Sequence, residues 1–333
     1  MSARILIAGG YGVVGSAIAR HIRKVSKDAE LVLAGRNPAN GAALAQELGG
    51  ASTAYLNVED TTAPGDLAAV DLIVCAVYDP ANTLINAALT HGIAHIGITT
   101  KADDVAPVAF AALRSPPRRP IVLLGHCMAG VATIVAQKAA ERFSRVDSIE
   151  IAAVYDERDP VGPMTAGDAE SLVSRALLRE GGKWAWVDGL QHARPVRLSG
   201  DEVLPGYPTG LLDAPSLSAI TGAANVRLDL VQGDSFGTRR GGRASSDVYI
   251  DIAGLLESGE PGNLRTVISD PNGLAHLTAL GVLVAAEHVL GLHGQAPAAG
   301  GLHLPETLVP PDAAIARFEQ FGAGIISDPE RVQ

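Results

Sequence analysis

The chain has 333 residues, enough to bury more core than one ordinary domain, so we expect two domains. Its formal net charge of -10 disfavours nucleic acid and an anionic membrane as partners, and its two cysteines are too few for a disulfide framework. No apolar run approaches the roughly 20 residues of a membrane span, and the first residues predict a buried strand rather than a signal peptide. We therefore expect a soluble, cytoplasmic protein.

Short apolar runs alternate with helical periodicity over residues 1–125, a pattern typical of βαβ units around a parallel sheet. Between the first two runs, apolar residues from Val14 to Val25 recur at spacings of three and four, which predicts an amphipathic helix. Parallel strands joined by right-handed crossovers make a doubly wound Rossmann domain, so we expect the α/β class. Six strands are predicted, at residues 4–9, 29–35, 51–58, 71–77, 94–99 and 120–125.

In residues 126–272 the regular alternation of short apolar runs and helices ends, which predicts a second domain of the α+β type. Helices are expected over 128–143 and, after a loop rich in Pro and Gly, over 169–180. We expect the turn 236–243 to be the tip of a hairpin. Strands are expected at 148–155, 183–190, 193–200, 225–233 and 245–259. In residues 273–333 we expect a long apolar helix and a helix announced by prolines, both packing back on the Rossmann domain.

A glycine-rich turn separates the first predicted strand from its helix. The glycines fit two templates, G-x-G-x-x-G beginning at Gly10 and G-x-x-G-x-x-G beginning at Gly9. Such glycines permit positive φ and let the backbone approach a pyrophosphate, which the helix N-terminus then binds with its amide dipoles. We expect a dinucleotide to be held by the turn residues Gly9, Gly10, Tyr11, Gly12, Val13, Val14 and Gly15.

The end of the second strand selects the cofactor. NAD sites usually place an Asp or Glu there, about 20 residues past the glycines, to accept a hydrogen bond from the ribose 2′-hydroxyl. This strand ends in Gly35, Arg36 and Asn37 instead. A guanidinium has the charge and fork geometry that suit a 2′-phosphate. The sequence therefore favours NADPH/NADP+, with Arg36 on the 2′-phosphate.

The second glycine template also occurs in short-chain dehydrogenases, which carry a Tyr-x-x-x-Lys catalytic pair. None of the six tyrosines is followed four residues later by lysine. That class of dehydrogenase is therefore excluded.

Ligands of open α/β sheets bind beyond the carboxyl ends of the strands, so residues at those ends are candidates for chemistry. Ala76 and Val77 end the fourth strand, where we expect them beside the cofactor, and Tyr78 follows them. Lys101 follows the fifth strand and His126 the sixth. Hydride transfer leaves an atom that needs a proton, and Lys101, His126 or Tyr78 can supply it.

Other features leave alternatives open. Cys127 could form a thioester, as in N-acyl-glutamyl-phosphate and semialdehyde dehydrogenases, or it could be a small buried side chain. Arginines of the turn 236–243 could hold a substrate carboxylate or lie solvated at a hairpin tip. The nine histidines include no H-E-x-x-H motif, so we predict no metal. A lid or a solvated loop is predicted for the charged residues Asp156, Arg158, Asp159 and Asp168.

Five separated segments together resemble the saccharopine dehydrogenase-like family. In that family's order they are ILIAGGYGVVG, LVLAGRN, DLIVCAVYDPANTLINAALTHGIAHIGITT, GHCMAGVATIVAQKAAERF and AAGGLHLPETLVPPDAAIARFEQFG. Residues 150–270 match only in general plan. The resemblance implies an NADP-binding Rossmann domain joined to an α+β domain that holds a small-molecule substrate and builds a homodimer. It also implies hydride transfer between nicotinamide and the carbon of a C=N bond, whereas more distant relatives reduce other bonds, including C=C.

Two positions depart from the pattern of the saccharopine-forming members. Where those members read Thr-Ser-Tyr after strand five, this chain reads TTK, which puts Lys101 in the place of the tyrosine. Where they read Asp-Pro-Gly after strand six, this chain reads MAG, with Met128 in the place of the acid. The loss of these polar groups favours reduction of a less charged imine; a carbonyl or enoyl reductase, and a non-catalytic NADP-binding regulator, are the alternatives.

Overall fold

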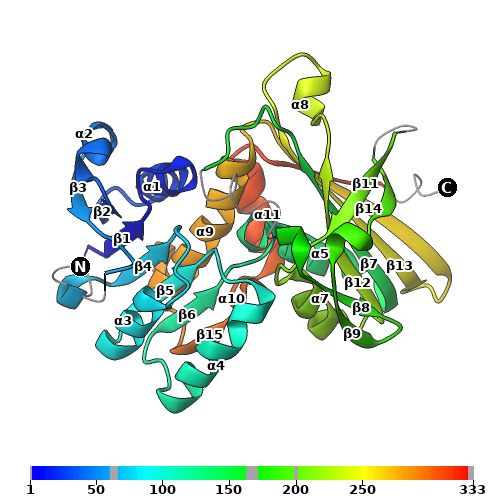
Figure 1. The fold of residues 1–333 in the computed structure, drawn as a ribbon, viewed down its shortest axis with the longest axis horizontal. Helices are drawn as coiled ribbons and strands as arrows, with labels where there is room; N and C mark the ends of the chain where they lie inside the picture. The colour runs from blue at the N-terminus through cyan, green and yellow to red at the C-terminus, as the bar shows by residue number, and fades with distance from the viewer. Residues whose placement is uncertain (1, 61–66, 163–171, 199–201, 329–333) are drawn as a thin grey trace. The chain divides into compact units, whose positions relative to one another are not determined.

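The computed structural model describes residues 2–60, 67–162, 172–198 and 202–328. The chain divides into two compact units, each built around one large sheet (Figure 1). The first unit comprises residues 1–125 and 279–309, and the second comprises residues 126–278 and 310–333. The predicted α/β class, with a doubly wound domain and a second α+β domain, is confirmed.

The first unit contains a seven-stranded sheet, and all its strand pairs are parallel. Its strands are β1 (Arg4–Ala8), β2 (Glu30–Gly35), β3 (Ala51–Tyr55), β4 (Leu72–Cys75), β5 (Ala94–Gly97), β6 (Pro120–Leu123) and β15 (Gly301–His303). Their order is β15-β6-β5-β4-β1-β2-β3, so the chain reverses its direction of growth between β1 and β4. The carboxyl ends of the strands on either side of this switch point form the expected ligand crevice of such a sheet.

The six predicted strands are present, and β15 is a seventh that was not predicted. β15 has only three residues and pairs with β6, which is remote in sequence, so no local pattern marks it. The helices of this unit include α1 (Val13–Val25), η1 (Pro38–Gly41), α2 (Ala42–Leu48), η2 (Leu67–Ala69), α3 (Thr83–His91), η3 (Ala102–Asp104), α4 (Val105–Arg114), most of α9 (Leu274–Leu290), η6 (Leu292–Gly294) and α10 (Pro305–Leu308).

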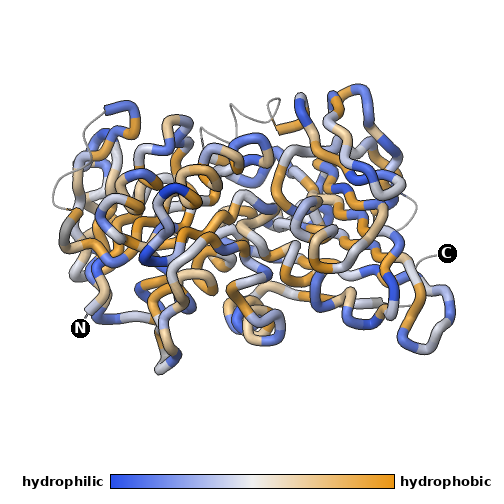
Figure 2. The backbone as a smooth tube through the Cα atoms, turned by 90° about the horizontal axis from the view of Figure 1, so that it is seen from below, coloured by the Kyte–Doolittle hydropathy of each residue, from blue (hydrophilic) through white to orange (hydrophobic). Residues whose placement is uncertain are grey.

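Apolar burial explains why these segments form the elements that they do. The strands β4 and β5 are buried along their whole length, as expected for central strands of a parallel sheet. In α1, the buried residues Gly15, Ile18 and Ile22 recur at helical spacing and make one stripe. Figure 2 shows hydrophobic stretches gathered within each unit and hydrophilic ones at many of its loops. No helix within the described ranges is both long and apolar enough to cross a membrane.

The second unit contains a nine-stranded mixed sheet. Its strands are β7 (Phe143–Tyr155), β8 (Ala176–Glu180), β9 (Lys183–Val187), β10 (Arg194–Arg197), β11 (Val203–Pro208), β12 (Asn225–Gln232), β13 (Ser246–Leu256), β14 (Pro261–Asp270) and β16 (Gly324–Asp328). Its helices include α5 (Val131–Ala140), α7 (Asp213–Thr221), α8 (Phe236–Arg239) and α11 (Pro311–Gln320).

The second unit contains elements that were not predicted, namely β11, α7, β14 and β16, and it departs from the prediction in further ways. The helix expected over 169–180 is present at the described residues 172–174 and is wrong for Ala176–Glu180, which is strand β8 and pairs with β9. The strands β12 and β13 do not form a hairpin, because β7 lies between them, parallel to β12 and antiparallel to β13. Residues 310–328 belong to the second unit, where β16 pairs with β14, whereas most of α9 belongs to the first.

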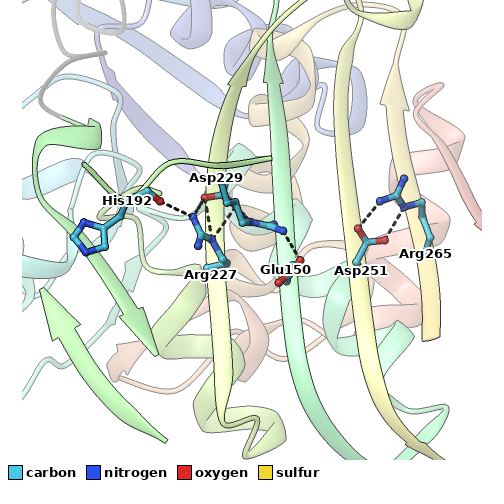
Figure 3. A network of polar contacts seen from close by, with 7 residues as sticks. Glu150, His192, Arg227, Asp229, Asp251 and Arg265 are labelled. Carbon is cyan, nitrogen blue, oxygen red and sulfur yellow. Dashed lines mark hydrogen bonds and ion pairs between the residues drawn. The ribbon is translucent and has the colours of Figure 1, made fainter. Parts of the chain in front are cut away.

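A row of charged side chains crosses one face of the second sheet (Figure 3). Arg227, Glu150, Asp251 and Arg265 are successive partners in the strand register, so their side chains share a face. Arg265 donates two hydrogen bonds of 2.6 Å to Asp251, and Arg227 donates bonds of 2.6 to 3.1 Å to the fully buried Asp229. Arg227 and Asp229 lie on the same strand, whereas the Asp251–Arg265 pair joins β13 to β14 and so favours the observed register of these two strands.

A buried histidine lies within the first sheet. His95 on β5 is 1% exposed, and neither of its ring nitrogens has a hydrogen-bond partner among the residues that the structure describes. Burial lowers the pKa of His95 from 6.5 to about 3. The folded protein therefore holds this imidazole neutral, because a charge at this site would be unsolvated.

This histidine makes stability depend on pH. Since its pKa is lower in the folded state, the unfolded chain takes up the proton first as pH falls below 6.5, and stability is lost from there down to about pH 3. At pH 5 the loss from this one group is about 2 kcal/mol. We expect His95→Leu to shrink the difference in free energy of unfolding between pH 7.5 and pH 5.0 by about that amount, measured by urea denaturation.

The exposed His91 on α3 provides the control, because His91→Asn should leave the difference between the two pH values unchanged. If His95→Leu lost as much stability as the wild type between these two pH values, the neutral buried imidazole would be disproved.

Candidate functional site

The turn between β1 and α1 is fixed by backbone contacts that leave no room for side chains. Gly9 has a φ of +78°, and its N–H donates to the carbonyl oxygen of Ala34 at 2.8 Å. A Cβ on Gly15 would lie 2.1 Å from the Gly9 oxygen, and a Cβ on Gly10 would lie 2.8 Å from the Ile7 oxygen. The glycines at positions 9, 10 and 15 thus allow α1 to begin in close contact with β1.

The N-terminus of α1 is open toward a ligand. Gly12 is the exposed N-cap residue, no side chain caps the helix, and the first turn contains no acidic residue. The amides of Val13 and Val14 belong to the helix start, where backbone N–H groups have no intrahelical acceptor. Uncapped amides and the helix dipole favour an anionic group, so this end of α1 suits a pyrophosphate.

At the carboxyl end of β2 the chain continues through Gly35, the exposed Arg36 and Asn37. The side chain of Tyr11 extends from the glycine turn across this strand end. Its hydroxyl oxygen accepts a hydrogen bond of 2.9 Å from the backbone N–H of Asn37. The turn and the end of β2 are therefore joined by a direct contact, and together they contain the residues predicted to bind a pyrophosphate and a 2′-phosphate.

The end of β4 borders the same turn. The N–H of Ala76 donates to the carbonyl oxygen of Ala8 at 3.0 Å. The Cγ1 atom of Val77 lies 2.9 Å from the position of a Cβ on Gly9. The structure thus brings the predicted cofactor-binding segments from β1, β2 and β4 together at the switch point of the sheet.

Two of the three predicted catalytic residues meet at the same sheet edge. Tyr78, which is 44% exposed, follows β4, and the half-buried Lys101 follows β5. The Nζ atom of Lys101 lies 5.8 Å from the centre of the Tyr78 ring, within range of a cation–π contact. The neighbouring Asp79 is a helix cap, because its carboxylate accepts hydrogen bonds of 2.9 and 2.8 Å from the first two amides of α3.

The third predicted catalytic residue, His126, lies in the second unit. It is 4% exposed, and its Nε2 atom lies 2.8 Å from the hydroxyl oxygen of Ser216. Burial lowers the pKa of His126 to about 3, so its imidazole is neutral at ordinary pH. A catalytic role for His126 stays a prediction.

Cys127 lacks the properties of an activated nucleophile. Its side chain is buried, and burial raises the pKa of the thiol well above its ordinary value. Its N–H donates to the buried carboxylate of Asp213 at 2.7 Å, which also accepts a bond of 2.7 Å from Thr133. Reactive cysteines have a lowered pKa and access to solvent, so this environment does not support the thioester alternative.

The segment just after Cys127 has an unusual backbone conformation, and the only sign of it in the sequence is the glycine at position 130. Met128, Ala129 and Gly130 have φ values of 51°, 50° and 91°, three consecutive residues in the left-handed region just before α5. For residues other than glycine this conformation costs roughly 1 to 2 kcal/mol each. The hydrogen bonds of Asp213 fix the ends of this segment.

The charged loop after β7 is anchored by hydrogen bonds. Burial opposes the charge of Asp156, but donors that include Thr238 at 2.5 Å and the amide of Ser235 at 2.9 Å outweigh it and lower its pKa to about 2. Asp159 accepts a bond of 2.6 Å from the first amide of α9. A pocket of about 230 Å³ lies beside this loop, lined by residues 155–158 and 232–234. Asp168 lies outside the described residues.

The arginines of the segment 236–243 differ in their contacts. All three are exposed, and Arg239 in addition pairs with Glu202 and donates to the Asp234 carbonyl oxygen at 2.8 Å. Arg239 therefore has a structural contact. If arginines of this segment bind a substrate carboxylate, Arg240 and Arg243 are the candidates.

No protein-family model matches this chain, and no curated protein sequence matches it. Its structure is similar to that of saccharopine dehydrogenase (L-Glu forming) from Saccharomyces cerevisiae, with a TM-score of 0.73 and 13% identity over 98% of this chain and 99% of that one. It is also similar to scyllo-inositol dehydrogenase from Lactobacillus casei with bound NAD(H) and scyllo-inositol, with a TM-score of 0.52 and 13% identity over 98% and 99% of the two chains. The chain therefore has a saccharopine dehydrogenase-like fold.

The contact between α1 and β1 can be tested with one added methyl group. Gly15→Ala would place a Cβ 2.1 Å from the Gly9 oxygen, so we expect the free energy of unfolding to fall by about 1 to 3 kcal/mol. Urea denaturation measures this change. Gly162→Ala is the matched control, because nothing lies within 4 Å of its added Cβ. Equal stability of the two variants would contradict the close approach.

Proposed function

We propose that this chain is an oxidoreductase that uses NADPH to reduce the C=N bond of a small metabolite. The observation that carries the proposal is the edge formed by β1, β2 and β4, where an uncapped helix start lies beside a strand end with Arg36 and no carboxylate. The dehydrogenases of similar fold support hydride transfer as the class of reaction.

The residues at this edge fit a dinucleotide. A Cβ would fill the space at Gly10 and Gly15, whereas Gly12 is exposed at the helix start, where a phosphate can approach the backbone. The α1 amides would hold the pyrophosphate, and Arg36 would hold the 2′-phosphate through two N–H groups. When bound, NADPH supplies the hydride.

Lys101 and Tyr78 then act on the substrate. Hydride addition to the imine carbon leaves an electron pair on nitrogen, and the Nζ of Lys101 donates the proton that this pair takes up. The Tyr78 ring, 5.8 Å away, attracts the ammonium group and keeps it at the edge where β4 and β5 end. We favour Lys101 over His126 as the donor, because His126 is buried, neutral and bonded to Ser216.

The cofactor proposal predicts a selective loss in an Arg36 variant. We expect wild-type protein to bind NADPH at least about tenfold more tightly than NADH, and Arg36→Ala to weaken NADPH by about 10- to 100-fold while NADH changes less than about twofold. Titration of the reduced cofactors by their own fluorescence measures both constants.

Arg114→Ala, an exposed arginine on α4, should bind both cofactors as the wild type does. The proposal fails if Arg36→Ala weakens the two cofactors equally, or if the wild type shows no preference.

The proton-donor proposal predicts the behaviour of a Lys101 variant. A panel of cyclic imines, aldehydes and enones, monitored by NADPH oxidation, identifies the acceptor class. With that acceptor we expect Lys101→Met to lower kcat by about 10²- to 10⁴-fold, without change in NADPH affinity. Lys183→Met on the exposed start of β9 is the control. Full turnover by Lys101→Met would remove this residue from the mechanism, and a wild type that oxidises NADPH with no acceptor would indicate a regulator.

A further inference from the structure

The side chain of Tyr11 packs against Gly35 and Gly41, and we call the space that it occupies its seat. A Cβ on Gly35, at the end of β2, would lie 2.4 Å from the hydroxyl oxygen of Tyr11. A Cβ on Gly41, in η1, would lie 2.7 Å from the Cδ1 atom of the same ring. Only glycine at both positions leaves room for the ring, so the phenol has a defined place over the segment 35–41.

The hydrogen bonding of this phenol leaves one donor. Its oxygen accepts the N–H of Asn37 at 2.9 Å, and no acceptor for its own hydrogen occurs among the described residues. A phenolic hydroxyl can donate one hydrogen bond while it accepts another. Tyr11 can therefore donate to a ligand while it remains fixed by the backbone of residue 37.

The hydroxyl of Tyr11 lies where a dinucleotide fold recognises the adenine ribose. In a dinucleotide fold the carboxyl end of β2 carries the group that contacts the 2′-substituent of the adenine ribose, usually a carboxylate for NAD. Here the phenol is bonded to the second residue after β2, next to Arg36. The group at this strand end is thus a fixed donor.

We propose that the Tyr11 hydroxyl is a second determinant of cofactor choice, which donates a hydrogen bond to the 2′-phosphate that Arg36 binds. This inference rests on the proposed use of NADPH. A phosphate oxygen is a charged acceptor, and hydrogen bonds to charged groups are stronger than those to a neutral ribose hydroxyl. The phenol, unlike the exposed guanidinium, is held in place before the cofactor arrives.

The test uses Tyr11→Phe, which keeps the ring in its seat and removes only the hydroxyl. The probes are 2′,5′-ADP, which carries the 2′-phosphate, and ADP, which lacks it, each titrated by calorimetry. We expect Tyr11→Phe to weaken 2′,5′-ADP by about tenfold and to change the affinity for ADP by less than about twofold. Thermal unfolding of the variant verifies that it folds.

Tyr55→Phe is the matched control, because Tyr55 ends the neighbouring strand β3 and its hydroxyl donates to Asp60 at 3.0 Å. This variant should retain the wild-type preference. Equal weakening of both probes by Tyr11→Phe would make the hydroxyl a structural support of the turn and overturn the inference. An unchanged preference in Tyr11→Phe would overturn it while leaving the proposed cofactor intact. A wild type without preference for 2′,5′-ADP would overturn both.

Discussion

The contact of α1 with β1 is the constraint on which the rest of the site depends. The oxygen of Gly9 occupies the space that a side chain at position 15 would need. The Ala34 oxygen accepts the N–H groups of both Gly9 and Gly10, at 2.8 and 3.3 Å, which ties the turn to β2. With the turn fixed in this way, the first amides of α1 lie open, and the side chain of residue 11 is directed across the end of β2.

The parts of this arrangement that depend on local sequence could be predicted. Six of the seven strands of the first unit are short apolar runs, and the turn glycines stand at fixed spacing, so these elements are marked by their own residues. Because carboxyl ends of parallel strands share one edge, Tyr78 and Lys101 could be expected near each other although they are remote in sequence. The α/β fold could be predicted for the same reason, because its strands and helices are marked by local patterns in the sequence.

The parts that depend on distant contacts could not be predicted. The segment Ala176–Glu180 has a composition compatible with a helix, and its pairing with β9 decides that it is a strand. The separation of β12 from β13 by β7 follows from the second sheet as a whole, in which the facing carboxylates Glu150 and Asp251 are paired with Arg194 and Arg265. The position of Tyr11 requires glycine at 35 in β2 and at 41 in η1, and the sequence does not show that both contact the same ring.

In the proposed function, cofactor binding and proton supply depend on different kinds of group. In this proposal, nucleotide recognition uses backbone amides and one exposed guanidinium, which need no change of protonation. Proton supply is assigned to Lys101, which remains half-buried beside an aromatic ring, whereas the neutral His126 and the buried Cys127 are held by hydrogen bonds within the second unit.

The central claim is that the dinucleotide binds along the edge formed by the glycine turn and the end of β2. Hydrogen–deuterium exchange with and without saturating NADP+ tests it most directly, because backbone amides at the binding edge should be protected. We predict slower exchange over residues 9–16 and 35–41, with weaker protection of 35–41 by NAD+ at equal occupancy. Unchanged exchange in both segments, with protection elsewhere, would contradict the account.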